Sequence, residues 1–185
     1  ELRRLLKQLA LPSIIVTHDW AEALTLGDRM AVVSGGEVLQ TGTPMDVFSR
    51  PRNAEVAHVV GVETVVKGQV VWAAAGMLRV EVNGVVVNAI EGEGCGPDVY
   101  VCIRAEDIAI ERGPIAASSA RNQLAGTVTA VAVLGALARV TVHCGFPLVA
   151  TVTRSSVEDL QLVPGQAVTA VIKAGAVHLV SRQDH

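Results

Sequence analysis

The spacing of apolar residues changes at Gly61, and this change constrains the fold more than any other feature of the sequence. From Val62 onward apolar and polar residues alternate, with glycine or asparagine interrupting about every 8 to 12 residues, as is typical of antiparallel barrels and sandwiches. We therefore expect a β region with no long helix over residues 62–185.

The residues up to Gly61 have the spacing of a mixed α/β segment. Helical periodicity and caps predict helices over about 2–9, 20–26, 44–49 and 54–60. The apolar run Ser13–Thr17 predicts a buried strand, and Ser34-Gly35-Gly36 predicts the turn of a hairpin between 30–33 and 37–41. Residue 1 falls inside the first helical pattern with no N-cap before it, which predicts that the chain is a fragment.

The β region contains an internal duplication. Three pairs of segments are similar: 67–70 with 125–128, 79–82 with 139–142, and 99–110 with 168–179. The offset between the copies grows from 58 to 69 residues, so the second copy has longer loops. We expect a mostly β fold: two tandem OB-like five-stranded β-barrels, over 62–115 and 116–185, after a partial α/β domain over 1–61.

Charge is distributed unevenly along the chain. Residues 1–61 sum to -1 (6 basic, 7 acidic), residues 62–115 to -4 (4 and 8), and residues 116–185 to +2 (5 and 3). The last segment is therefore the natural place for a small anion. The net charge of -3, with no basic stretch interleaved with aromatic residues, argues against nucleic acid as a partner.

The three cysteines, Cys95, Cys102 and Cys144, lack the C-x-x-C spacing of zinc and redox sites. We expect them to be reduced core residues of a cytosolic protein. His143 and Cys144 are neighbours in a predicted strand and point to opposite faces, so we expect no metal site. No apolar run reaches the roughly 20 residues of a membrane helix.

Residues 14–24, 28–32, 36–38 and 40–44 resemble the end of an ABC-type ATPase domain. His18 matches the switch histidine, which in that family contacts the γ-phosphate of ATP held between two subunits. The resemblance implies a catalytic role for His18, with ATP and Mg as cofactors, in the complete subunit. This chain has no G-x-x-x-x-G-K-[ST] loop, no acidic magnesium-binding strand and no signature motif, so we expect it to be inactive alone.

Residues 119–124, 150–156 and 171–174 resemble the molbindin-like domain of molybdate transport and sensing proteins. A tetrahedral dianion requires backbone N–H groups, hydroxyls and cations, because it cannot donate protons itself. The resemblance implies an oxyanion site made of Ser119, Ala120, Arg121, Thr153, Ser155, Lys173 and Ala174. It implies molybdate as the ligand, or tungstate or sulfate, and a homodimer, because the family's sites lie at subunit interfaces.

The duplication indicates which copy holds the anion. Ile172-Lys173-Ala174 aligns with Ile103-Arg104-Ala105 of the first copy, where Glu106 and Asp107 follow. In the second copy Gly175 and Ala176 occupy the places of these acids, so Lys173 has no adjacent acid to neutralise it. We therefore expect the anion site in the second copy.

Together these resemblances imply part of the ATP-binding subunit of a bacterial molybdate importer, with its oxyanion regulating transport. The subunit would lie at the cytoplasmic face of the cell membrane, against the permease subunits. Two alternatives stay open. One is a regulatory TOBE module of a sugar or other importer, in which Arg121 and Lys173 are solvated charges and no anion binds. The other is a free-standing molybdate storage or sensor protein, which would have no use for His18.

Overall fold

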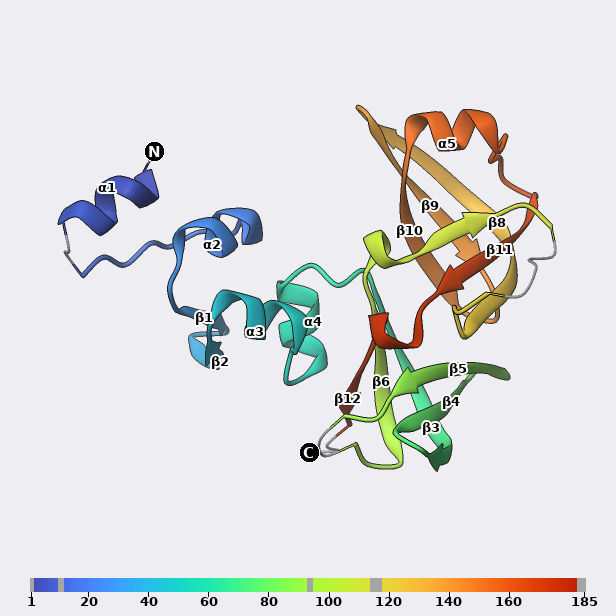
Figure 1. Cartoon of the computed structure of the whole chain (residues 1–185), viewed down its shortest axis with the longest axis horizontal. Coiled ribbons are helices and arrows are strands. Elements are labelled where there is room, and N and C mark those ends of the chain that lie inside the picture. The colour runs from blue at the N-terminus through green and yellow to red at the C-terminus, as the bar shows by residue number, and fades with distance from the viewer. Residues whose placement is uncertain (1, 10–11, 93–94, 114–117, 183–185) are drawn as a thin grey trace. The chain divides into compact units, whose positions relative to one another are not determined.

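A computed structural model describes residues 2–9, 12–92, 95–113 and 118–182 of the chain (Figure 1). Contacts divide the chain into two compact units, Glu1–Gly61 and Val62–His185. None of the described helices has the length and apolar character needed to cross a membrane.

The first unit contains the predicted helices and hairpin. Its elements are α1 (Leu2–Leu9), α2 (Trp20–Leu26), β1 (Met30–Ser34), β2 (Glu37–Gly42), α3 (Pro44–Ser49) and α4 (Ala54–Val59). Three of the helices begin where a side chain can cap them: Asp19, Thr43 and Asn53 accept hydrogen bonds from backbone N–H groups of the first turn. Local sequence chemistry therefore accounts for these boundaries.

The predicted strand over Ser13–Thr17 is wrong. Residues 12–17 belong to no helix or strand, and Ile14 and Val16 are each 95% exposed. A fully apolar strand is stable only inside a sheet, where neighbouring strands pair with its edges and packed layers cover both of its faces. The segment is a strand of none of the described sheets, and Ile14 and Val16 stay exposed.

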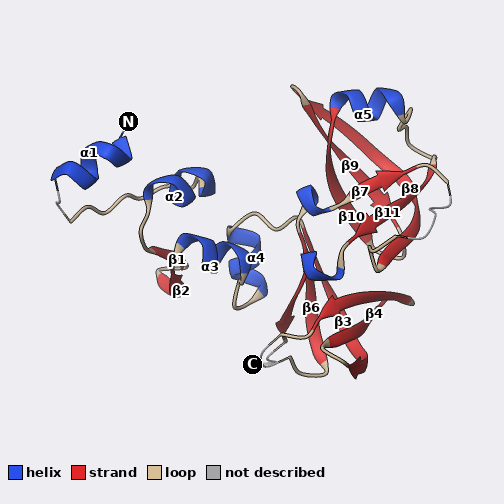
Figure 2. Cartoon of the chain, in the orientation of Figure 1, coloured by secondary structure: helices blue, strands red, loops and turns tan. Residues whose placement is uncertain are grey.

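The second unit consists of two curled five-stranded antiparallel sheets, which confirms the mostly β fold with OB-like barrels (Figure 2). The first sheet has the order β12-β6-β3-β4-β5 and the second β10-β9-β8-β11-β7. The strands of the first sheet are β3 (Thr64–Ala74), β4 (Met77–Val82), β5 (Val85–Ile90), β6 (Asp98–Ile103) and β12 (Val177–Ser181). Those of the second are β7 (Ala109–Glu111), β8 (Asn122–Leu134), β9 (Leu137–His143), β10 (Pro147–Thr153) and β11 (Ala167–Ile172).

The two barrels exchange their last strands, which the sequence did not predict. Strand β7, in the first copy, pairs with β11 of the second sheet, and β12, at the end of the second copy, pairs with β6 of the first. The expectation that 62–115 and 116–185 would each close a separate barrel is therefore corrected. The exchange has a physical consequence: buried side chains of both sheets form one continuous hydrophobic core.

The duplication is visible in the repeated strand order. However, the match between β4 and β9 is shifted by two residues from the sequence alignment of 79–82 with 139–142. A Cβ on Gly68 would meet Val80, and a Cβ on Gly126 would meet Val142, so Val80 matches Val142 rather than Val140. The shift arises because the β8–β9 hairpin has two more residue pairs beyond its bulge than the β3–β4 hairpin. The second copy also adds a short helix, α5 (Arg154–Asp159).

Gly126 is required by close packing between β8 and β9. A Cβ there would lie 2.6 Å from Val142 Cγ1 and 2.7 Å from the carbonyl oxygen of His143. We expect Gly126→Ala to lower the free energy of unfolding by about 1–3 kcal/mol, because the backbone must move. Urea denaturation measures this, with Gly92→Ala as the control, since a Cβ at Gly92 meets only Cys95 Sγ at 3.9 Å. Equal losses in the two variants would contradict the packing argument.

The three cysteines differ in accessibility. Cys102 and Cys144 are buried free thiols, whereas Cys95 is partly exposed. Burial raises the pKa of Cys102 to about 12 and also raises the pKa of Cys144, so both stay protonated at pH 8. Because the thiolate is the reactive form, we expect iodoacetamide at pH 8 to alkylate native Cys95 and to spare the other two until urea is added. Mass spectrometry of the modified peptides checks this order; rapid native labelling of Cys102 would contradict it.

Candidate functional site

The second barrel brings two cations together at one end of its sheet. Asn122 pairs with Ile172, so Arg121, just before β8, lies next to Lys173, just after β11. Both side chains are exposed, and neither forms a salt bridge with any described residue. Two exposed cations at neighbouring positions could both contact one bound anion.

Polar groups around this pair come from the segments predicted for the site. Ser119 is exposed, and Ala120 donates its backbone N–H to Ser118 Oγ at 3.1 Å. Ala174 begins the short helix η2 (Ala174–Ala176), and no described residue accepts a hydrogen bond from its N–H group. The end of the barrel therefore offers a hydroxyl and a backbone donor beside the cations.

Asn122 fixes this arrangement to the first barrel. Its side chain is buried, accepts a hydrogen bond from Asn88 N at 2.6 Å and donates one to Asn88 O at 2.9 Å. The Asn88 amide in turn donates to the carbonyl oxygen of Arg121 at 3.1 Å. Asn122 is not among the residues that the sequence predicts for the site. Its partner is 34 positions away, so no local signal identified it.

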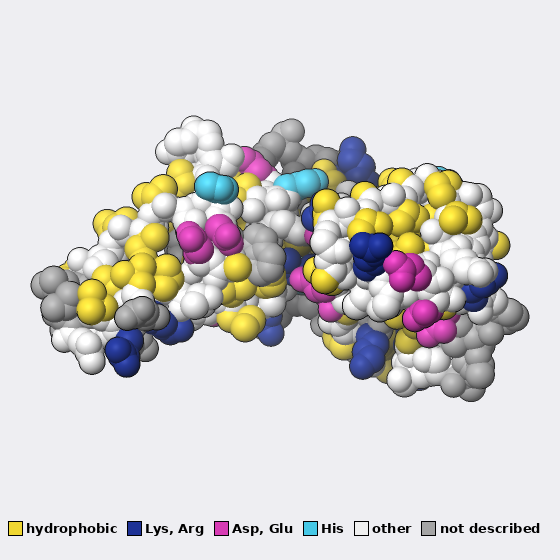
Figure 3. Space-filling model, turned by 90° about the horizontal axis from the view of Figure 1, so that it is seen from above, with side chains coloured by type: hydrophobic (Ala, Val, Ile, Leu, Met, Phe, Trp, Pro, Cys, Tyr) yellow, Lys and Arg dark blue, Asp and Glu magenta, His cyan; other side chains and the backbone are white. Residues whose placement is uncertain are grey.

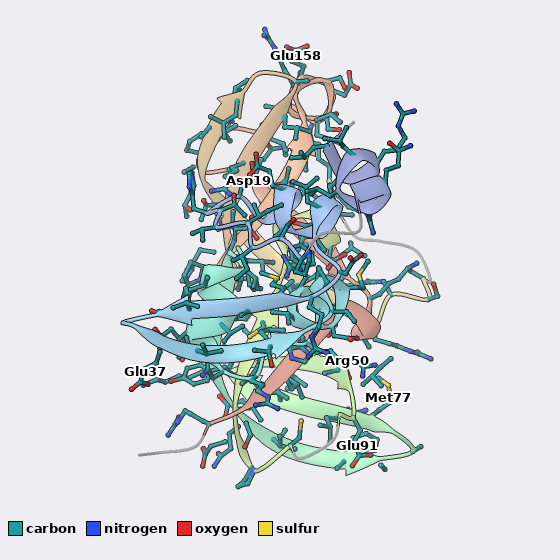
Figure 4. All side chains as sticks on the ribbon, turned by 90° about the vertical axis from the view of Figure 1, so that its left-hand side faces the viewer. Asp19, Glu37, Arg50, Met77, Glu91 and Glu158 are labelled. Atoms are coloured by element: carbon teal, nitrogen blue, oxygen red, sulfur yellow. The ribbon has the colours of Figure 1, made fainter. Side chains whose placement is uncertain are left out.

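Thr153 and Ser155 lie at the opposite end of the barrel. Thr153 caps α5, with its Oγ1 accepting from Ser156 N at 3.1 Å and lying 2.9 Å from Ser155 Oγ. It pairs with Leu137 beside the β8–β9 turn, whereas Arg121 precedes the start of β8. Strand β8 has 13 residues at roughly 3.3 Å each, so about 40 Å of strand runs between these two ends. In Figure 4, Glu158 of α5 marks the end of the second barrel remote from Met77 and Glu91 of the first.

The predicted site residues thus form two groups within one chain. Ser119, Ala120, Arg121, Lys173 and Ala174 lie together, and Thr153 and Ser155 lie apart from them. Figure 3 shows cationic, acidic and hydrophobic side chains interspersed on the visible face. Among the described residues, no group of three or more His, Cys, Asp or Glu side chains could hold a metal ion.

The equivalent end of the first barrel holds acids around its cation. Burial lowers the pKa of Arg104, and Glu106, Glu63 and Asp107 oppose this by favouring the charged guanidinium. Burial and the neighbouring Glu106 raise the pKa of Asp107. The sequence pointed to Glu106 and Asp107 as neighbours of Arg104. It did not point to Glu63, which the pairing of β3 with β6 brings next to Arg104.

His18 is exposed in the first unit. It follows the extended segment 12–17, and neighbouring Asp19 caps α2 through hydrogen bonds from Ala21 N and Glu22 N. Thr17 Oγ1 donates to Glu22 Oε2 at 2.7 Å, which ties the segment to the helix. His18 therefore stands at a capped helix start with its side chain accessible.

Comparison with known proteins identifies relatives over nearly the whole chain. The TOBE domain family matches residues 118–179. The molybdate/tungstate import ATP-binding protein WtpC of Pyrococcus horikoshii is 36% identical over 182 residues, which is 97% of this chain and 50% of that protein. The spermidine/putrescine import ATP-binding protein PotA of Acetivibrio thermocellus is 31% identical over 100% of this chain and 48% of that protein. The chain spans about half the length of these relatives.

A solved structure shares the fold of the β region. The cytoplasmic molybdate-binding protein ModG, crystallised with molybdate bound, aligns with a TM-score of 0.57 and 26% identity. The alignment covers 66% of this chain and 98% of ModG. A protein made of this fold alone therefore accommodates molybdate.

Proposed function

The chain belongs to the family of import ATP-binding proteins that carry a TOBE domain, and from this premise we propose that its second barrel binds molybdate or a similar tetrahedral oxyanion. We propose that it does so as part of the ATP-binding subunit of an importer for that anion. The observation that carries the proposal is the adjacent, exposed pair Arg121 and Lys173, without an acid partner among the described residues. The molybdate-binding relatives support the choice of anion.

The proposed site requires two copies of the chain. Arg121 and Lys173, with Ser119, Ala120 and Ala174, supply charge and backbone donors, while Thr153 and Ser155 supply hydroxyls from the other end of the barrel. One chain cannot bring both groups to one anion, but a homodimer that packs opposite ends together can. Dimerisation through the β region is therefore part of the proposal.

In the complete subunit, His18 would contact the γ-phosphate of ATP, and Mg would accompany the nucleotide. The exposed position of His18 at the start of α2 supports this role, because ATP would be held between two subunits. The subunit would act at the cytoplasmic face of the membrane, against permease subunits.

Bound oxyanion would then regulate transport by favouring a non-hydrolysing arrangement of the paired ATPase domains. We expect molybdate to lower ATP hydrolysis by the complete subunit, and to have no such effect on Lys173→Ala. ATPase assays across a molybdate titration test this. Hydrolysis that is indifferent to molybdate in the parent subunit would contradict the regulatory role.

A second candidate is a TOBE module without an anion site, favoured by the relatedness to spermidine/putrescine import proteins. Thermal denaturation with molybdate, sulfate or spermidine separates the two. A ligand that binds the folded state raises the melting temperature. We expect a rise with molybdate and none with spermidine; no rise with any of them would favour the second candidate.

A further inference from the structure

The two barrels have equivalent ends that carry opposite charges at one matching position. Thr64 pairs with Ile103 in the first barrel as Asn122 pairs with Ile172 in the second. In both barrels this buried polar residue accepts a hydrogen bond from the other barrel: Thr64 Oγ1 from Val149 N at 3.2 Å, and Asn122 Oδ1 from Asn88 N at 2.6 Å. The residue just before it is Glu63 in the first barrel and Arg121 in the second.

The Glu63 carboxylate occupies donors of the kind that an oxyanion would use. Its Oε2 accepts a hydrogen bond from Ala105 N at 3.1 Å, and Ala105 is the counterpart of Ala174. Its Oε1 lies 3.3 Å from Arg139 Nη2, and Arg104 is close enough to interact with its charge. Glu63 is 18% exposed, so this carboxylate is largely enclosed. A backbone N–H with two guanidinium groups is a set of donors suited to a tetrahedral dianion.

We propose that the first barrel contains a second oxyanion site, which the Glu63 carboxylate keeps closed by taking the place of the anion. The protein therefore binds one anion per chain instead of two. This inference rests on the proposed function, because it transfers the anion chemistry of the second barrel to the equivalent end of the first.

Tethering explains why free anion does not displace the carboxylate. At similar intrinsic affinity, a carboxylate held on the same chain at an effective concentration of about millimolar or above outcompetes a micromolar oxyanion. Loss of Glu63 would leave Ala105 N–H and the Arg139 guanidinium without this acceptor. A dianion could then accept hydrogen bonds from both groups and neutralise the guanidinium charge. Opening the site therefore requires removal of a single side chain.

Titration calorimetry with molybdate, on Glu63→Ala and the parent chain, tests the proposal. We expect the stoichiometry to rise from one to two anions per chain, and to return to one in Glu63→Ala with Arg139→Ala. Glu106→Gln is the matched control: it removes a negative charge beside Arg104 but leaves Glu63 in place, so we expect one anion. Glu63→Gln is the fallback variant if Glu63→Ala does not fold. It keeps the shape of the side chain and an acceptor for Ala105 N–H, so we expect a second molybdate to bind, but more weakly than in Glu63→Ala.

A Lys173→Ala background separates failure of this inference from failure of the proposed function. There we expect binding weakened about tenfold or more with Glu63 present, and one tightly bound anion per chain with Glu63→Ala. One anion in both the parent and Glu63→Ala would overturn the closed site and leave the second-barrel site intact. No binding in the parent but one anion in Glu63→Ala would support the closed site and contradict the proposed function. No binding in any folded variant would overturn both.

Discussion

Replacing Arg121 and Lys173 together by alanine is expected to weaken molybdate binding about a hundredfold or more. Each hydrogen bond to a charged group contributes about 1.5–3 kcal/mol, and about 1.4 kcal/mol corresponds to a tenfold change in affinity. The two side chains are adjacent and have no acid partner among the described residues, so the anion loses both cations of its site. Calorimetric titration of the double variant measures the loss.

Lys67→Ala is the matched control for this experiment. Lys67 is an exposed cation of β3 in the first barrel, so its removal changes the net charge without touching the proposed site. We expect its affinity for molybdate to stay within about twofold of the parent, because exposed distant charges are largely screened at physiological salt. A double variant that binds as tightly as Lys67→Ala would show that the two cations hold no anion.

The second large effect is expected from Asn122→Ala, which should lower the free energy of unfolding by about 2–4 kcal/mol. The Asn122 amide pairs with both the N–H and the carbonyl oxygen of Asn88, and each buried polar group left without a partner costs about 1–3 kcal/mol. This pair of hydrogen bonds joins β8 to β5, so the two barrels of the variant should also unfold less cooperatively. Urea denaturation followed by circular dichroism measures both effects.

Asn88→Ala separates the roles of the two asparagines. It removes the Asn88 amide but keeps the backbone N–H and carbonyl oxygen that Asn122 contacts. We expect a loss of about 1 kcal/mol, the typical net contribution of a hydrogen bond. Equal losses in the two variants would contradict the assignment of the link to the Asn122 side chain.

Much of the fold follows from local sequence, but strand exchange does not. Alternation and turn residues predicted the β region, and the cap residue before Pro44 predicted the start of a helix. The exchanged strands β7 and β12 are only three and five residues long, and alternation reveals a strand's buried face without revealing its partner. The prediction of a strand over Ser13–Thr17 failed for a related reason. Its apolar pattern is that of a buried strand, but none of the described sheets includes it.

The duplication offered a comparison from which candidate site residues could be predicted. Lys173 stood out because its counterpart Arg104 is followed by acids. Glu63 did not, because it lies 42 positions from Ala105 and only sheet pairing brings them together. Thr153 and Ser155 were grouped with the cations by resemblance, and the structure separates the two groups within a chain. Resemblance to a family names candidate residues without showing whether one chain brings them together.

The central claim is that the second barrel binds an oxyanion, and direct titration of the unaltered chain with molybdate tests it most simply. Sedimentation in the same buffer should first establish that the protein is folded and dimeric. We then predict saturable binding of one molybdate per chain that excess sulfate does not displace. A folded dimer that takes up no molybdate would contradict the claim and return Arg121 and Lys173 to the role of solvated charges.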